Sequence, residues 1–133
     1  MASILRVNTL TDASSNNSVP MATVNQGTAK AWVNFTGQTN TAERDSFNIS
    51  SLTDAATAKT YPISFTSNMG NINYTGSYFQ SGSVTGTDYN HFNNNYVGGF
   101  GSRATNSFGV HSYSASSAID VARNDTVIFG DSA

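Results

Sequence analysis

The stretch KAWVNF (Lys30–Phe35) is the clearest indication of the fold class of this chain. Every second residue in it, Ala31, Val33 and Phe35, is apolar. In a β-strand these three side chains would share one face and Trp32 would lie on the other, because successive side chains point to opposite faces. The stretch therefore predicts a half-buried strand.

Working outward from this stretch, short segments with the same alternation or with strand-forming residues recur along the chain. Pro62, inside one of them, predicts an edge strand or the start of a strand. Asn25-Gln26-Gly27 predicts a turn, and SAIDVA (residues 117–122) is the one short candidate for a helix. The other expected strands are Ser3–Leu10, Arg44–Leu52, Thr60–Phe65, Asn71–Gln80, Phe108–Ser114, Ala118–Val121 and Thr126–Phe129.

The composition also favours strands. The chain has 19 Ser, 16 Thr and 16 Asn among 133 residues, and only two lysines and one glutamate. These small polar residues suit strands and turns, whereas good helix formers are scarce. Hydrophobic residues at 38% and aromatic residues at 11% argue against disorder. We expect an all-β protein, a small antiparallel β-sandwich or jelly-roll-like barrel.

The N-terminal segment predicts an extended arm. We expect residues 1–18 to form a strand followed by a polar linker (Thr11–Ser18), and residues 19–133 to form a single β domain. The strand has no obvious local hairpin partner, and exposed strand edges need cover. We therefore expect an assembly arm that pairs with a neighbouring subunit, with the linker as an adaptable connection. Its contact residues would be Ile4, Leu5 and Val7, with Trp32 as an aromatic anchor on the outer face of its strand.

Charge and residue usage exclude several classes of function. The net charge is −2 and the six cationic side chains are scattered, so we expect no nucleic-acid binding. The chain has no cysteine, and two histidines with a nearby Asp88 are too few for a metal site, so we expect no metal and no cofactor. No apolar run has the length of a secretory signal or a transmembrane helix, so we expect synthesis in a cytosol and no membrane insertion.

Glu43 and Asp45 are the one pair of carboxylates with a spacing that suits catalysis. On a regular strand they would share a face about 7 Å apart, within the range used in glycoside hydrolysis. The alternative is a charged strand edge that discourages aggregation. No nucleophile lies in a catalytic motif, so we interpret the chain as non-enzymatic.

A long segment rich in Asn and Gly, from Gly86 to Ser107, predicts a functional loop. Its aromatic rings and amides could contact sugars or varied protein surfaces, or could pack against a neighbouring subunit. The alternative is a plain polar loop whose aromatic side chains fold back onto the core. We expect Gly98, Gly99 and Gly101 to permit the turns that present these groups. The predicted contact residues are Tyr89, His91, Phe92, Asn94 and Tyr96.

Three segments in the first part of the chain, SILRVNTLTDASSNN, VNQGTAKAWVNF and RDSFNISSLTD, carry a family resemblance. They resemble tail-fibre and appendage proteins of tailed bacteriophages, particularly marine phages that infect cyanobacteria, and the ending VIFGD is similar as well. The resemblance covers Ser3–Asp54. It implies a virion structural protein, made in the host bacterial cytoplasm, that takes part in host attachment. The alternative is a capsid decoration protein that stabilises the shell. It also implies a homo-oligomer, a trimer, in contact with other virion proteins.

Overall fold

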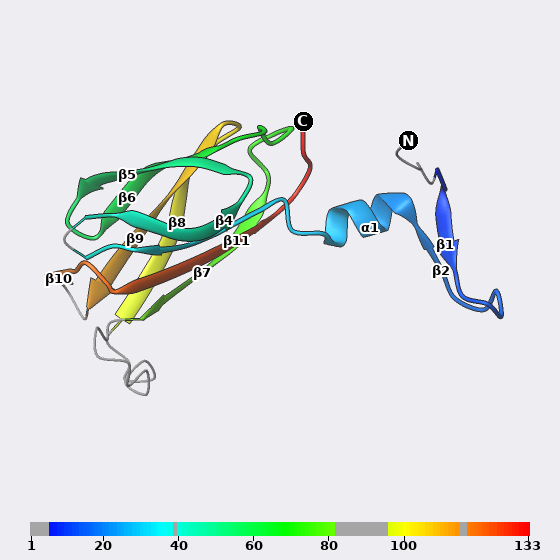
Figure 1. Cartoon of the computed structure of the whole chain (residues 1–133), viewed down its shortest axis with the longest axis horizontal. Helices are drawn as coiled ribbons and strands as arrows, with labels where there is room; N and C mark the ends of the chain where they lie inside the picture. The colour runs from blue at the N-terminus through cyan, green and yellow to red at the C-terminus, as the bar shows by residue number, and fades with distance from the viewer. Residues whose placement is uncertain (1–5, 39, 82–95, 115–116) are drawn as a thin grey trace.

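Figure 1 shows a two-layered β-sandwich from which an N-terminal arm projects. The structure, a computed structural model, describes residues 6–38, 40–81, 96–114 and 117–133. The arm contains β1 (Thr9–Thr11), β2 (Ser18–Pro20) and α1 (Met21–Gly27). The sandwich contains β3 (Ala31–Thr36), β4 (Ala42–Phe47), β5 (Ile49–Ala56), β6 (Lys59–Phe65), β7 (Thr75–Ser81), β8 (Tyr96–Ala104), β9 (Ser107–Ser114), β10 (Ser117–Ala118) and β11 (Arg123–Phe129).

Two antiparallel sheets face each other in the sandwich. One sheet has the order β4-β3-β11-β7. In the other, β9 is paired with β6, β8 and the short β10, and β6 is paired with β5. The predicted all-β sandwich is therefore confirmed, and the arm extends from it as a separate two-stranded sheet.

The core lies between the two sheets and includes the apolar residues of KAWVNF. Ala31, Val33 and Phe35 are almost fully buried, and the residues between them are partly exposed. Phe35 and the aromatic rings of the facing sheet fill the centre, with Phe65 and Phe108 at a ring distance of 5.4 Å. The alternation in KAWVNF thus predicted the buried face of β3.

Several local predictions were wrong. Residues 44–52 form two strands, because the chain turns at Asn48 with a φ of 58°. Residues 25–27 end a helix and form no turn of their own, and SAIDVA contains the short β10 and no helix. The strand predicted from Asn71 begins at Thr75, and the end of the Gly86–Ser107 loop is strand β8.

Pro62 lies inside β6, a strand paired on both sides, and not at an edge or a strand start. The pairing of β6 with both neighbours is interrupted here, passing directly from Thr60 to Ile63. A proline fits at this point because no ladder hydrogen bond requires its missing N–H.

Candidate functional site

The arm is the part of the described chain that has no core of its own. We define it as residues 6–27. Thr9–Thr11 pairs with Ser18–Pro20, so the strand does have a local partner, contrary to the expectation from sequence. The segment Thr11–Ser18, expected to be an adaptable linker, contains the ends of both strands and the connection between them, residues 12–17. No residue of α1 is buried.

Hydrogen bonds to one carboxylate organise the hairpin turn. The backbone N–H of Asn16 donates to Asp12 at 3.0 Å, and the side-chain amide of Asn17 donates to it at 2.7 Å. Asp12 N–H also donates to the Asn17 carbonyl at 3.0 Å. The Asn17 amide holds the pKa of Asp12 below its ordinary value, because it stabilises the charged form. The polar tract is therefore ordered by its own side chains.

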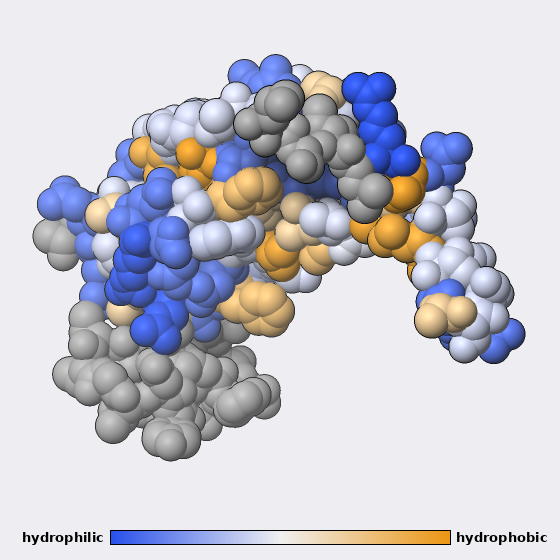
Figure 2. Space-filling view, turned by 45° about the vertical axis from the view of Figure 1, so that its right-hand side comes forward, coloured by the Kyte–Doolittle hydropathy of each residue, from blue (hydrophilic) through white to orange (hydrophobic). Residues whose placement is uncertain are grey.

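One face of this hairpin is apolar. Leu10 and Val19 are directly opposite each other in the register, so their side chains share a face. Their exposed fractions are 46% and 41%. Val7, just before β1, is also exposed, and Figure 2 shows apolar surface on the arm. A two-stranded hairpin with an uncovered apolar face is marginally stable in water.

The helix α1 connects the hairpin to the sandwich and is fastened at both ends. The Met21 N–H donates to the Asn8 carbonyl at 2.9 Å. At the other end the Lys30 ammonium donates to the Asn25 carbonyl and, at 2.6 Å, to the Asn25 side-chain oxygen. Lys30 is buried, although on a regular strand it would share the outer face with Trp32. The arm is thus held away from the sandwich, as Figure 1 shows.

A groove opens where the helix ends and the sandwich begins. It has a volume of about 500 Å³. The Phe47 ring, 53% exposed, is the largest apolar side chain at this groove, which we call the Phe47 groove. Its lining residues are Thr28, Ala29, Lys30, Phe47, Asn48, Thr66, Ser67 and Ser132.

The side-chain amide and the ammonium group of the Phe47 groove already have hydrogen-bond partners within the chain. The Asn48 side-chain amide donates to the Lys30 and Ser67 carbonyls, both at 3.0 Å. Its oxygen accepts the Ser67 N–H at 2.7 Å. The groove therefore offers apolar surface for contact, because its amide and ammonium groups have partners.

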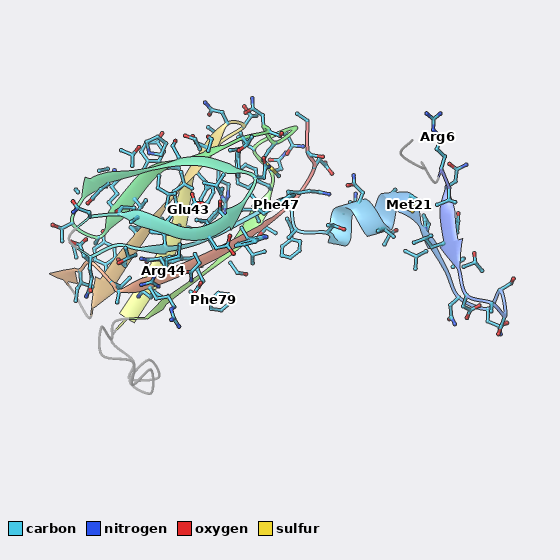
Figure 3. The ribbon with its side chains drawn as sticks, viewed as in Figure 1. Arg6, Met21, Glu43, Arg44, Phe47 and Phe79 are labelled. Atoms are coloured by element: carbon cyan, nitrogen blue, oxygen red, sulfur yellow. The ribbon has the colours of Figure 1, made fainter. Side chains whose placement is uncertain are left out.

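Phe47 lies on the outer face of the sheet β4-β3-β11-β7. It is opposite Trp32, and Trp32 is opposite Val127, so these three side chains form one row across the sheet. Trp32 lies on the outer face, as predicted, and is partly exposed. Phe79, on the edge strand β7, is 64% exposed and lies farther from the arm than Phe47 (Figure 3).

The carboxylates considered as a catalytic pair do not share a face. Asp45 is opposite Asn34 and Glu43 is opposite Phe35, with an irregularity between the two pairs. Because Asn34 and Phe35 are consecutive on β3, they point to opposite faces, and so do their partners on β4. Glu43 accepts a hydrogen bond from the Ser46 hydroxyl at 2.7 Å. The geometry that motivated the catalytic interpretation is therefore not formed.

The predicted contact loop falls largely outside the described residues. Tyr89, His91, Phe92 and Asn94 lie there, as do Ile4 and Leu5 of the arm. Tyr96 is described as the first residue of β8, opposite Ser114.

The glycines that follow Tyr96 were interpreted wrongly. Gly98, Gly99 and Gly101 belong to β8 and do not form loop turns. A Cβ at Gly98 would lie 2.3 Å from the Tyr78 ring, and a Cβ at Gly99 would lie 2.0 Å from the His111 ring. Two of these glycines thus make room for neighbouring rings, a contact that no local pattern reveals.

A polar cluster at the end of the sandwich away from the arm is structural. The Tyr78 hydroxyl donates to the buried Asn124 side chain, whose amide donates to the Val121 carbonyl at 3.3 Å. Burial raises the pKa of Tyr78 to about 12, because it disfavours the phenolate. The cavity there is about 10 Å³, which is room for at most one water molecule.

Within the described residues there is no group of three or more side chains suited to a metal ion, and no helix long and apolar enough to span a membrane. Comparison of the chain with protein families, with characterised proteins and with solved structures found no match. The candidate site is therefore built from geometry alone: the apolar arm and the Phe47 groove. Of these residues, the sequence analysis named Val7 but not Leu10, Val19 or Phe47. The only signal for Val19 was its position after the polar tract that follows Leu10.

Proposed function

We propose that this chain is a non-enzymatic structural subunit of a bacteriophage virion, a tail-fibre or appendage protein that assembles through its N-terminal arm. The observation that carries the proposal is the apolar hairpin face of Leu10 and Val19. Exposed apolar surface of this kind, on an element without a core, is typical of segments that become ordered against a partner. The resemblance of Ser3–Asp54 to phage appendage proteins supports a virion as the place of assembly.

The assembled form is a homotrimer in this proposal. Each subunit contributes an arm and a β-sandwich, and contact with the host is made by the region that contains Tyr96 and the residues before it. Three copies would raise a weak contact with a host glycan or protein by avidity. A capsid decoration protein is the alternative, and it would use the same arm to clamp the subunits of the shell.

Electron microscopy of intact virions tests this proposal. Gold-labelled antibodies against the chain are applied to purified particles of the phage that carries the sequence. We expect label on the tail or its appendages. Label on the shell would select the decoration protein, and purified particles without label would overturn both.

A phage that carries the chain without residues 1–20 provides a second test. We expect the truncated chain to accumulate in infected cells but to be missing from particles. Normal incorporation of the truncated chain would show that the arm is not the assembly element.

A further inference from the structure

We propose that the arm of one copy docks in the Phe47 groove of a second copy, with Leu10 and Val19 as the inserted side chains. This inference rests on the proposed function, which requires assembly through the arm, and it names the partner and the receiving surface. The inserted surface is small and entirely aliphatic. It consists of Leu10 and Val19, which lie side by side on one hairpin face. An open groove of about 500 Å³ has room for both.

The arm cannot fill the groove of its own chain. The groove is lined by Thr28, Ala29 and Lys30, at the C-terminal end of α1, whereas the hairpin is joined to the N-terminal end. A helix of seven residues separates them by about 10 Å. Neither end of α1 has a free linker that would let the hairpin fold back to the groove. At one end β2 is followed directly by α1, and at the other end Lys30 is hydrogen-bonded to Asn25.

The arm of a second copy suits the groove in its charge, and arms and grooves are equal in number. The described arm has one cation, Arg6, and one anion, Asp12, so it carries no net charge into an apolar groove. Every copy brings one arm and one groove, so a closed ring or a reciprocal pair leaves neither of them uncovered.

Two of the open sheet edges, β4 and β5, are poorer acceptors for the arm. The edge strand β4 has three consecutive charged residues, Glu43, Arg44 and Asp45, together with the irregularity at Asn34 and Phe35. The other sheet ends in β5, whose pairing with β6 is irregular at three places. Charges and bulges of this kind prevent an added strand from pairing. The Phe47 groove has no such protection.

Cysteine crosslinking between copies tests the contact directly, because the natural chain has no cysteine. Two full-length single-cysteine variants, Val19→Cys and Ser132→Cys, are mixed and oxidised, and the linked peptides are identified by mass spectrometry. We expect a 19–132 disulfide, which can form only between two copies. The matched control replaces Ser132→Cys by Ser77→Cys, an exposed position on the outer face of the sheet that contains Phe47, and should give at least about 10-fold less product.

Association measured by sedimentation gives the second readout. Phe47→Asp and Leu10→Asp should each weaken association about 100-fold, since a charge would enter an apolar contact. Phe79→Asp is the control, because Phe79 is even more exposed but lies outside the groove. Combining Leu10→Lys with Phe47→Glu should restore association, which a variant that merely misfolds could not do.

The outcomes separate this inference from the proposed function. Equal effects of Phe47→Asp and Phe79→Asp, or equal crosslinking to positions 132 and 77, would overturn the groove as the acceptor. If the groove were overturned in this way but the chain without residues 1–20 were still missing from virions, the proposed function would stand. Only the inference about the groove would then be wrong. A 19–132 disulfide in a chain that is missing from virions would support the groove and overturn the virion role.

Discussion

At the scale of single residues, two neighbouring glycines of β8, Gly98 and Gly99, differ in how well the structure can accept a side chain. The ring that would meet a Cβ at Gly98 belongs to Tyr78, which is held by its hydrogen bond to buried Asn124. The ring above Gly99 belongs to His111, which is exposed and can rotate away. The same added methyl group therefore meets a fixed obstacle at one position and a movable one at the next.

We expect Gly98→Ala to lower the free energy of unfolding by about 1–3 kcal/mol, the usual cost of overpacking a fixed site. Gly99→Ala should cost less than about 1 kcal/mol, since the imidazole can move into solvent. Chemical denaturation of the two variants, compared with the natural chain, measures both values. Equal losses would mean that the Tyr78 ring is not held in place.

The raised pKa of Tyr78 makes stability depend on alkaline pH. The folded chain favours the neutral phenol, so this contribution is complete below about pH 10, the ordinary pKa of an unfolded tyrosine, and is lost as the pH rises through about 12. After allowance for partial exposure the loss should amount to roughly 2 kcal/mol. Thermal unfolding between pH 9 and pH 12 measures it, and Tyr78→Phe is the control that should show a flatter pH dependence.

At the scale of elements, the arm hairpin depends on a turn built by one carboxylate. Asp12 accepts hydrogen bonds from Asn16 and Asn17, and these favour its charged form. A lowered pKa means that the stabilisation is present above the ordinary value of 3.8 and is lost as the pH falls through the lower, folded value. Acid should therefore loosen the hairpin while the sandwich remains folded.

Titration of the Asp12 carboxyl group by NMR tests this prediction. We expect an inflection below 3.8, accompanied by loss of the Thr9–Pro20 hairpin contacts. Asn17→Ala removes the largest cause of the shift, so the pKa of Asp12 should rise toward 3.8 in that variant. An unchanged pKa would show that the Asn17 amide does not hold this carboxylate.

At the scale of the whole molecule, the buried core and most of the exposed aliphatic side chains lie in different parts of the described chain. All the buried core residues of the described chain lie from Lys30 onward. Of its four exposed large aliphatic side chains, Val7, Leu10 and Val19 lie in the arm and Ile72 lies before β7. Removal of the arm should therefore leave the sandwich intact and abolish association.

Sedimentation of the natural chain and of a variant without residues 1–20 tests this division. The proposed trimer of a 14.1 kDa chain has a mass of about 42 kDa, and the truncated variant should sediment as a monomer. Its far-UV circular dichroism should still be that of a β protein, which shows that the sandwich has folded. A truncated chain that remains associated would place the assembly contact in the sandwich itself.

The sequence by itself determined the fold class and one buried face. Alternation in KAWVNF is a property of neighbouring residues, and Ala31, Val33 and Phe35 are buried as it predicts. The scarcity of helix formers likewise acts locally, on each segment separately. The outward position of Trp32 was accessible in the same way, whereas the local partner of the N-terminal strand was not.

Only the tertiary structure decided how these local pieces are joined. Asn48 turns the chain with a positive φ, and the irregularity in β4 places Glu43 and Asp45 on opposite faces; both depend on the partner strand. The helix α1 is fastened by Lys30, and the Phe47 groove gathers residues from positions 28 to 132. Such contacts join residues far apart in the chain, so no local periodicity records them.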